Sequence, residues 1–260
     1  MAIKFGPASL GGVKEAILNL EKYNHLGLQA CEIAFTYSAY IKKKEDAEKI
    51  GKAAKKLGIK LSIHAPYWIN LNSDDEEKIK RSKERILESC KVGTWLGAYR
   101  VVFHPGYYGK NKEGAYKNIK NNILDIQRTM KEEGYTPKLA PEIMGKINVF
   151  GSIDEIHKLV EETGCSFCID FAHILARYKE YKFKETLEKF KKHKELHIHF
   201  SGIVYGEKGE KHHKKTGKEE WKKLLSHLKL FSKSKEITIV NESPSHIQDA
   251  VEGLEIWKSN

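Results

Sequence analysis

Cysteine and proline are scarce in this sequence. The chain has four cysteines and six prolines among 260 residues. Four cysteines are too few for a disulfide-based scaffold, so we expect Cys165 and Cys168, which fall in the apolar run CSFCID, to be buried small residues in a reducing compartment. With few prolines and 40% hydrophobic residues, the composition is that of a globular protein without long disordered segments.

Long apolar runs are also absent. No segment reaches the roughly 18 apolar residues that a membrane-spanning helix needs. The N-terminal stretch MAIKFGPASLGG lacks the basic segment and the long apolar segment of a secretory signal. We therefore expect a cytoplasmic protein that does not interact with membranes.

Positive charge, by contrast, is in excess. The formal net charge is +11 and the sequence pI is about 9.2, which favours a polyanionic partner such as nucleic acid. Much of this charge is lysine interleaved with glutamate, as in KKKEDAEKIGKAAKK, and such segments are typical of solvated helix faces. Charge alone therefore indicates a partner only weakly.

Short β-branched runs alternate with longer segments of helical periodicity along the chain. The expected strands are IKF from Ile3, ACEIAF from Ala30, KLSIHA from Lys60, RVVFHP from Arg100, KLAPEI from Lys138, CSFCID from Cys165, ELHIHF from Glu195 and ITIVNE from Ile237. The expected helices begin near Val13, Lys43, Asp74, Asn111, Ser152, Lys182, Gly217 and Ser245, with capping boxes at Ser73 with Glu76 and at Ser152 with Glu155. This alternation predicts an α/β fold, a (β/α)8 TIM barrel, in a single domain over residues 1–260.

Ionisable residues gather where the expected strands end. The active site of a (β/α) barrel lies at the C-terminal ends of its strands. Strands three to eight end in or carry His64, His104, Glu142, Asp170, His197 with His199, and Glu242. Burying so many imidazoles and carboxylates is costly unless divalent cations supply compensating charge. A nitrogen and oxygen donor set without cysteine suits zinc first, and also admits manganese or iron.

Two further groups extend this set. His173 follows Asp170 by three residues, in CIDFAHI. The loop after the seventh strand, SGIVYGEKGEKHHKKTG, is unusually long and carries Glu210, His212 and His213. We expect this loop to fold over the barrel mouth, and the combined donors to suffice for three ions.

Tyr67 and Trp68 follow His64 directly in HAPYWINL, at the expected rim of the site. Two interpretations stay open. The rings pack under neighbouring loops, or they wedge into a DNA duplex, where bulky side chains unstack and kink base pairs. Tyr40 and Tyr107 could extend the same surface.

Seven motifs occur in order across nearly the whole chain: HAPYWINL, FHPG, APEI, CIDFAH, HIHFSG, GEKHH and NESP. Together they resemble the endonuclease IV family of apurinic/apyrimidinic endonucleases, metal-dependent DNA-repair enzymes built on a (β/α) barrel with three zinc ions. The resemblance implies hydrolysis of the phosphodiester on the 5′ side of an abasic site in double-stranded DNA, which leaves a 3′ hydroxyl. It also implies a monomeric enzyme.

The resemblance also implies a ligand set. One zinc ion would be held by His64, His104 and Glu142, a second by Glu142, Asp170, His197 and Glu242, and a third by His173, Glu210 and His212. Glu142 would bridge two ions and is the expected catalytic residue. Strand alternation puts His199 on the same face as His197, and we expect it to support the ligands rather than to bind metal. Mn²⁺ or Fe²⁺ could replace zinc at some sites.

Four departures from the family pattern concern mainly the DNA-facing surface. Glu210 stands where many members have aspartate, and FGPASLGG, with Pro7, stands where many have a histidine-containing segment. Tyr40 stands where members often place an arginine that probes DNA, and Trp68 where leucine is usual. These changes preserve the metal chemistry but alter the expected nucleic-acid-binding residues Tyr40, Tyr67 and Trp68.

Two other functions remain open on the sequence. Sugar isomerases and epimerases of the xylose isomerase-like barrels share the architecture and use Glu, Asp and His around one or two metals, and fold alone cannot separate them from nucleases. A non-catalytic nucleic-acid-binding relative could retain the metals for stability. The extra ligand groups, the aromatic pair and the net charge of +11 favour the nuclease.

Overall fold

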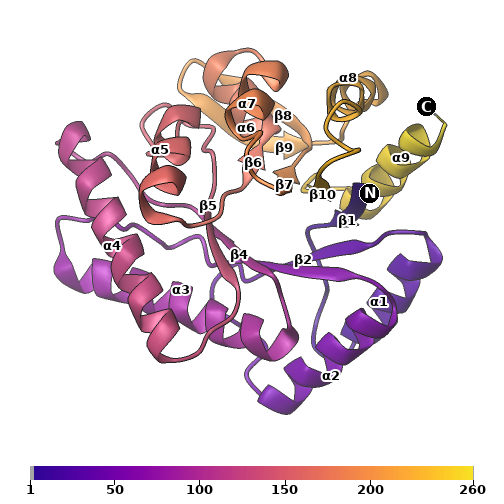
Figure 1. Cartoon of the computed structure of the whole chain (residues 1–260), viewed down its shortest axis with the longest axis horizontal. Coiled ribbons are helices and arrows are strands. Elements are labelled where there is room, and N and C mark those ends of the chain that lie inside the picture. Colours follow the sequence, from indigo (N-terminus) through magenta and orange to yellow (C-terminus); the bar gives the residue numbers. More distant parts are fainter. Residues whose placement is uncertain (1–2, 260) are drawn as a thin grey trace.

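Within residues 3–259, which the computed structural model describes, eight parallel strands form a closed barrel (Figure 1). The strands are β1 (Ile3–Pro7), β2 (Ala30–Ala34), β3 (Lys60–His64), β4 (Arg100–Phe103), β5 (Lys138–Pro141), β6 (Ile169–Asp170), β7 (Glu195–His199) and β10 (Glu236–Asn241). They pair in the orders β2-β3-β4-β5 and β6-β7-β10-β1. A parallel bridge between Glu142 and Cys168 joins β5 to β6, and the Gln29 N–H donates to the Phe5 carbonyl between β1 and β2. The predicted TIM barrel is confirmed.

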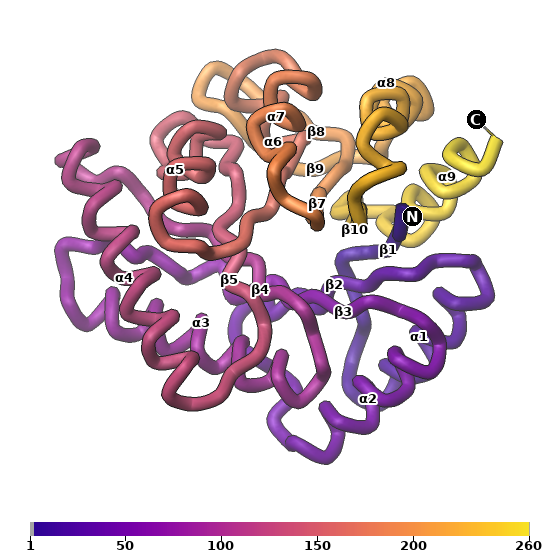
Figure 2. The backbone as a smooth tube through the Cα atoms, viewed as in Figure 1, coloured from indigo at the N-terminus to yellow at the C-terminus, as the bar shows by residue number. Residues whose placement is uncertain are grey.

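Helices surround the strands (Figure 1). They are α1 (Ala16–His25), α2 (Lys44–Lys56), α3 (Glu76–Leu96), α4 (Lys112–Glu132), α5 (Ile153–Thr163), α6 (Phe171–Tyr178), α7 (Phe183–Lys189), α8 (Lys218–Leu228) and α9 (His246–Lys258). Among the described residues, no helix is long and apolar enough to cross a membrane. The chain closes on itself, since β1 pairs with β10 and lies beside α9 (Figure 2).

The helix starts confirm one predicted capping box and correct the other. Ser152 and Glu155 form the reciprocal pair at the start of α5. Before α3, however, Asp75 is the N-cap, and its carboxylate accepts from the backbone N–H groups of Glu77 and Lys78. Ser73 caps nothing in the helix because its hydroxyl accepts from the Asp75 N–H in the preceding turn.

The inner and outer faces of the barrel differ in polarity. On β7, Leu196 and Ile198 pack in the core shared with the helices, whereas the alternate residues His197 and His199 lie inside the barrel. The four cysteines are all buried and free, which confirms the prediction for Cys165 and Cys168. The barrel interior is therefore partly polar, although such interiors are usually filled by branched apolar side chains.

The long loop after β7 lies over the barrel mouth, as predicted, and it forms a β-hairpin there, which the sequence analysis did not predict. Its strands are β8 (Gly202–Gly206) and β9 (Gly209–Lys214), paired antiparallel. Gly209 forms an isolated bridge with Lys146, in the loop after β5. Gly209 has a φ of 96°, and a Cβ there would lie 2.2 Å from the Gly145 carbonyl oxygen. Glycine is thus required for the close approach that docks the hairpin.

We predict that Gly209→Ala weakens this docking. The added methyl group would meet backbone atoms and the residue would keep a strained φ, so the free energy of unfolding falls by about 1–3 kcal/mol. Urea denaturation measures this loss, and faster hydrogen exchange of the β9 amides locates it. Gly206→Ala is the matched control because its Cβ would meet only the flexible end of the Lys211 side chain. Equal losses for the two variants would contradict the assigned role of Gly209.

Candidate metal centre

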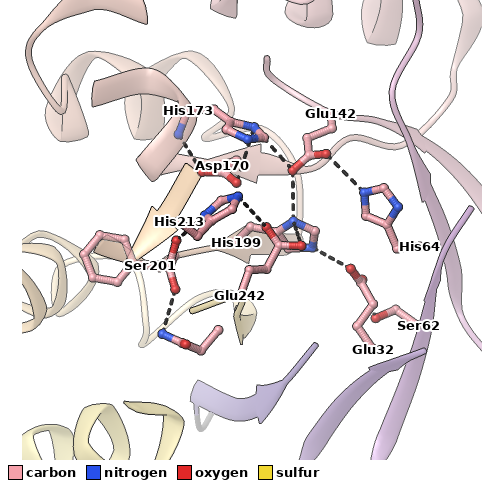
Figure 3. A network of polar contacts seen from close by, with 12 residues as sticks. Glu32, Ser62, His64, Glu142, Asp170, His173, His199, Ser201, His213 and Glu242 are labelled. Atoms are coloured by element: carbon pink, nitrogen blue, oxygen red, sulfur yellow. Dashed lines mark hydrogen bonds and ion pairs between the residues drawn. The ribbon is translucent and has the colours of Figure 1, made fainter. Parts of the chain in front are cut away.

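Glu142 lies at the centre of the polar cluster at the barrel mouth (Figure 3). It follows β5 and is fully buried. Its Oε2 atom lies 3.3 Å from His64 Nε2 and 3.0 Å from His104 Nε2. The donor atoms of these three residues lie within 4.8 Å of one another. The structure thus brings together the first ligand group that the resemblance implies.

A second group shares the Glu142 carboxylate. Its members are Glu142, Asp170, His199 and Glu242, whose donor atoms also lie within 4.8 Å of one another. His199 Nδ1 lies 2.9 Å from Glu142 Oε1 and 3.3 Å from Glu242 Oε1. Asp170 Oδ1 accepts from the His173 N–H at the start of α6, whereas Asp170 Oδ2 has no hydrogen-bond donor.

His199 therefore takes the place that the sequence analysis gave to His197. Both side chains point into the barrel, but His197 lies two residues farther from the strand's C-terminal end and so deeper along the axis. There His197 Nε2 lies 2.9 Å from Glu32 Oε2, and its Nδ1 accepts from the Tyr99 hydroxyl. The geometry therefore favours His199 over His197 for this donor group, and the sequence could not separate them because face alone does not fix height along the barrel.

A third group lies beneath the hairpin and consists of His173, Glu210 and His213. His173 Nε2 lies 3.4 Å from Glu210 Oε2. The prediction named His212, which is exposed. In a regular strand Glu210 and His212 would share a face. The pairing of β8 with β9 shifts, however, and leaves Lys211 without a partner in the ladder. This bulge turns His213 toward the site.

The histidines present defined nitrogens to the carboxylates. His64 Nδ1 contacts the Ala65 carbonyl at 2.8 Å, and His173 Nδ1 contacts the Ile143 carbonyl at 3.0 Å. A carbonyl can only accept, so both Nδ1 atoms are protonated and both Nε2 atoms face the cluster. His213 Nδ1 similarly contacts the Ser201 hydroxyl at 2.6 Å. Fixing one ring nitrogen in this way is typical of metal-binding histidines.

The carboxylates crowd one another. Burial, together with the charges of Glu142 and Glu242, raises the pKa of Asp170 to about 8 despite the nearby His173. Burial lowers the pKa of His64, but the hydrogen bond and the charge of Glu142 outweigh it and raise that pKa to about 9. A divalent cation fits this arrangement because it supplies positive charge and a ligand position for Asp170 Oδ2, which makes no hydrogen bond although it lies 3.3 Å from His173 Nδ1. The nitrogen and oxygen donors of the three groups suit zinc, manganese or iron.

Glu32 is a buried member of the network that the sequence analysis missed. It projects from β2 into the barrel, where Ser62 Oγ donates to its Oε2 at 2.7 Å. Burial would raise the pKa of Glu32, but the charge and hydrogen bonds of His199 and His197 hold it well below its usual range. The signal was present in ACEIAF, where one carboxylate interrupts an otherwise apolar strand.

A fourth set of donors lies deeper in the barrel and consists of Cys168, His197 and His199. Burial holds the pKa of the Cys168 thiol well above its usual range. The Cys168 side chain packs with Val102 and Ala140 in a small apolar layer.

Aromatic side chains form the rim of the mouth. Tyr67 is 54% exposed and Trp68 is 65% exposed, and the Tyr67 ring lies 5.8 Å from the rings of both His64 and His104. Tyr40 is held more firmly, because its hydroxyl donates to the Gly11 carbonyl at 2.9 Å. The most exposed ring of its loop is Tyr37, at 74%, which the sequence analysis did not single out.

Two cavities meet at Tyr67. One, of about 680 Å³, lies toward the loops after β1 and β2 and includes Tyr37 and Tyr40 in its lining. The other, of about 290 Å³, lies against the first turns of α3 and is lined by Tyr67, Trp68, Ile69, Asn70, Lys78, Arg81, Ser82, Arg85 and Tyr107. The second cavity combines aromatic faces with three cationic side chains and no carboxylate.

Comparison with known proteins agrees with this architecture. The chain is 39% identical over 242 residues to an uncharacterised protein of Methanocaldococcus jannaschii, covering 87% of this chain and 86% of that protein. It is 27% identical over 169 residues to a probable endonuclease 4 of Aquifex aeolicus, covering 58% of each chain. The Aquifex aeolicus relative confirms the resemblance to the endonuclease IV family, although the match spans little more than half of either chain.

Solved structures share the barrel along its whole length. SacUVDE superposes with a TM-score of 0.77 at 16% identity and covers 100% of this chain and 98% of its own. A D-tagatose 3-epimerase-like protein gives 0.69 at 23%, covering 98% and 96%, and endonuclease IV from Thermus thermophilus gives 0.68 at 20%, covering 100% and 98%. At these identities the likeness concerns the fold alone. A family model described as xylose isomerase-like TIM barrel matches residues 20–260, and the chain belongs to that family.

Proposed function

We propose that this protein is a metal-dependent endonuclease that hydrolyses the phosphodiester on the 5′ side of abasic sites in double-stranded DNA. The observation that carries the proposal is the set of three donor groups at one barrel mouth, two of which share Glu142. The probable endonuclease 4 relatives support the same activity. A net charge of +11 suits a polyanionic substrate.

Three groups of side chains would hold the ions. The first group is His64, His104 and Glu142; the second is Glu142, Asp170, His199 and Glu242; and the third is His173, Glu210 and His213. When bound, divalent cations activate water and neutralise charge on a phosphodiester. Glu142 fixes the spacing of the first two groups because one of its oxygens faces His64 and His104 while the other faces His199. The preferred ion is zinc, three per chain, with manganese or iron as substitutes.

The rim supports a DNA substrate. Trp68 and Tyr67 are exposed beside the cluster, where their rings can enter the base stack at a lesion. An abasic nucleotide costs least to extrude because it makes no base pair. Lys78 and Arg81, in the first turns of α3, line the adjacent cavity and can bind backbone phosphates.

A sugar epimerase is the second candidate. The D-tagatose 3-epimerase-like structure superposes about as well as endonuclease IV does. The group of Glu142, Asp170, His199 and Glu242 also offers four donors, which suffice for a single ion. Elemental analysis discriminates the two candidates, because the nuclease requires all three groups to be filled and the epimerase only this one.

The cleavage assay tests the proposal directly. We expect purified protein supplied with zinc, manganese or cobalt to cut a duplex containing one abasic analogue immediately 5′ of it and to leave a 3′ hydroxyl. Chelation is expected to abolish cutting. We expect Glu142→Gln to lower the rate at least 100-fold, since the neutral amide cannot bridge two cations, while binding to the abasic duplex persists. Absence of cutting by the fully metal-loaded wild type would overturn the nuclease assignment.

Adjacent histidines on β9 provide a matched pair for the third donor group. We predict that His213→Ala lowers the bound metal by one ion per chain, whereas His212→Ala leaves the metal content unchanged because His212 is exposed. Elemental analysis after dialysis against metal-free buffer measures the difference. Loss of an ion from the His212 variant alone would restore the sequence-based choice.

Lys78 and Arg81 test the proposed DNA track. Each phosphate contact contributes about 0.9 to the slope of log Kobs against log salt concentration. We predict that the double variant Lys78→Ala, Arg81→Ala weakens duplex binding and reduces that slope by about 2. Lys55→Ala with Lys56→Ala is the control, because these lysines lie at the C-terminal end of α2, away from the mouth. A slope change in the control pair alone would place the DNA elsewhere.

A further inference from the structure

We propose that Glu32 is a positioning residue that fixes the His199 ring so that its Nδ1 atom faces the metal centre. The proposal rests on the metal-dependent function above. It concerns a residue outside the donor groups that contain Glu142, and it assigns a task to a charge that the barrel buries completely.

The His199 ring spans two carboxylates. Its Nε2 atom lies 2.8 Å from Glu32 Oε1, deep in the barrel, and its Nδ1 atom lies 2.9 Å from Glu142 Oε1, at the mouth (Figure 3). Only the Nδ1 contact, to Glu142, has the geometry of a hydrogen bond. An ion bound by Glu142 and Glu242 would replace the proton on Nδ1, and the proton on Nε2 would then stay beside the Glu32 carboxylate, which can only accept.

The other histidines of the site follow the opposite pattern. His64 and His173 place Nδ1 against backbone carbonyls and direct Nε2 at the cluster. In His199 the two nitrogens are exchanged, and the partner is a charged side chain in place of a neutral carbonyl. A carboxylate partner fixes the ring and raises the basicity of the ligating nitrogen, and losing such a partner typically costs roughly 10–100-fold in metal affinity.

Glu32 is itself held from three sides, of which His199 is one. Ser62, its neighbour in the β2–β3 register, donates to Oε2, and so does Nε2 of His197 at 2.9 Å. His197 is fixed in turn because its Nδ1 accepts from the Tyr99 hydroxyl. These contacts hold the Glu32 carboxylate so that its Oε1 atom faces His199 Nε2.

The alternative is that Glu32 only stabilises the barrel interior. A buried carboxylate with several donors does so in any case, since removing it leaves those donors unsatisfied. The two roles differ in what else changes. A stabilising residue affects unfolding but not zinc affinity, whereas a positioning residue affects the affinity of the ion at His199 and the nitrogen that binds it.

Glu32→Gln is the test because glutamine has the same shape but only one acceptor oxygen for donors that approach from two sides. Zinc affinity is measured on the whole chain without DNA, by competition with a chelator. We expect the variant to bind one ion roughly 10–100-fold more weakly. Asp249→Asn is the matched control, since Asp249 is a buried carboxylate that accepts from the Thr216 N–H outside the metal cluster. We expect its zinc affinity to stay within about twofold of the wild type, since no donor group includes it.

A second measurement uses the wild type alone and so does not depend on the variant folding. Long-range ¹H–¹⁵N spectra of the zinc-loaded protein are expected to show His199 protonated at Nε2 and metal-bound at Nδ1. Zinc on Nε2, or unchanged affinity in a folded Glu32→Gln protein, would overturn the proposal. Wild-type protein that binds zinc in this way without cutting DNA would leave Glu32 in its role and refute only the nuclease.

Discussion

One buried carboxylate, that of Glu142, organises the mouth of this barrel. Its two oxygens lie among His64, His104 and His199, which project from three different strands or the segments just after them. Those strands meet because the barrel is closed, and the bridge from Glu142 to Cys168 is one of the backbone contacts that join β5 to β6. The residue that links the donor groups therefore also sits at one of the two places where the halves of the barrel are joined.

Much of this arrangement is predictable because parallel strands deliver their C-terminal ends to one place. His64, His104, Asp170 and Glu242 end or follow strands whose apolar patterns are clear, and the structure brings all four to the mouth. The fold follows from the same alternation of strands and helices.

The differences between the sequence-based site residues and those that the structure brings together have physical causes that a pattern does not contain. His197 and His199 share a face, and only the depth of each in the barrel separates them. The choice between His212 and His213 depends on a bulge, which is a property of strand pairing rather than of composition. Glu32 was not predicted because the sequence of β2 does not show which side chains its carboxylate contacts. Those partners lie on β3 and β7 and are known only from the structure. Likewise, the sequence FTYSAY does not indicate that the Tyr40 hydroxyl donates to the Gly11 carbonyl or that Tyr37 is exposed to solvent.

The bulge at Lys211 also affects how the protein tolerates genetic change. Two neighbouring histidines follow it, and the register of the hairpin decides which of them faces Glu210. A mutation that removed the bulge would restore simple alternation and exchange His213 for His212, so an imidazole would still be delivered. The register of the hairpin thus determines which imidazole faces Glu210 rather than whether one does.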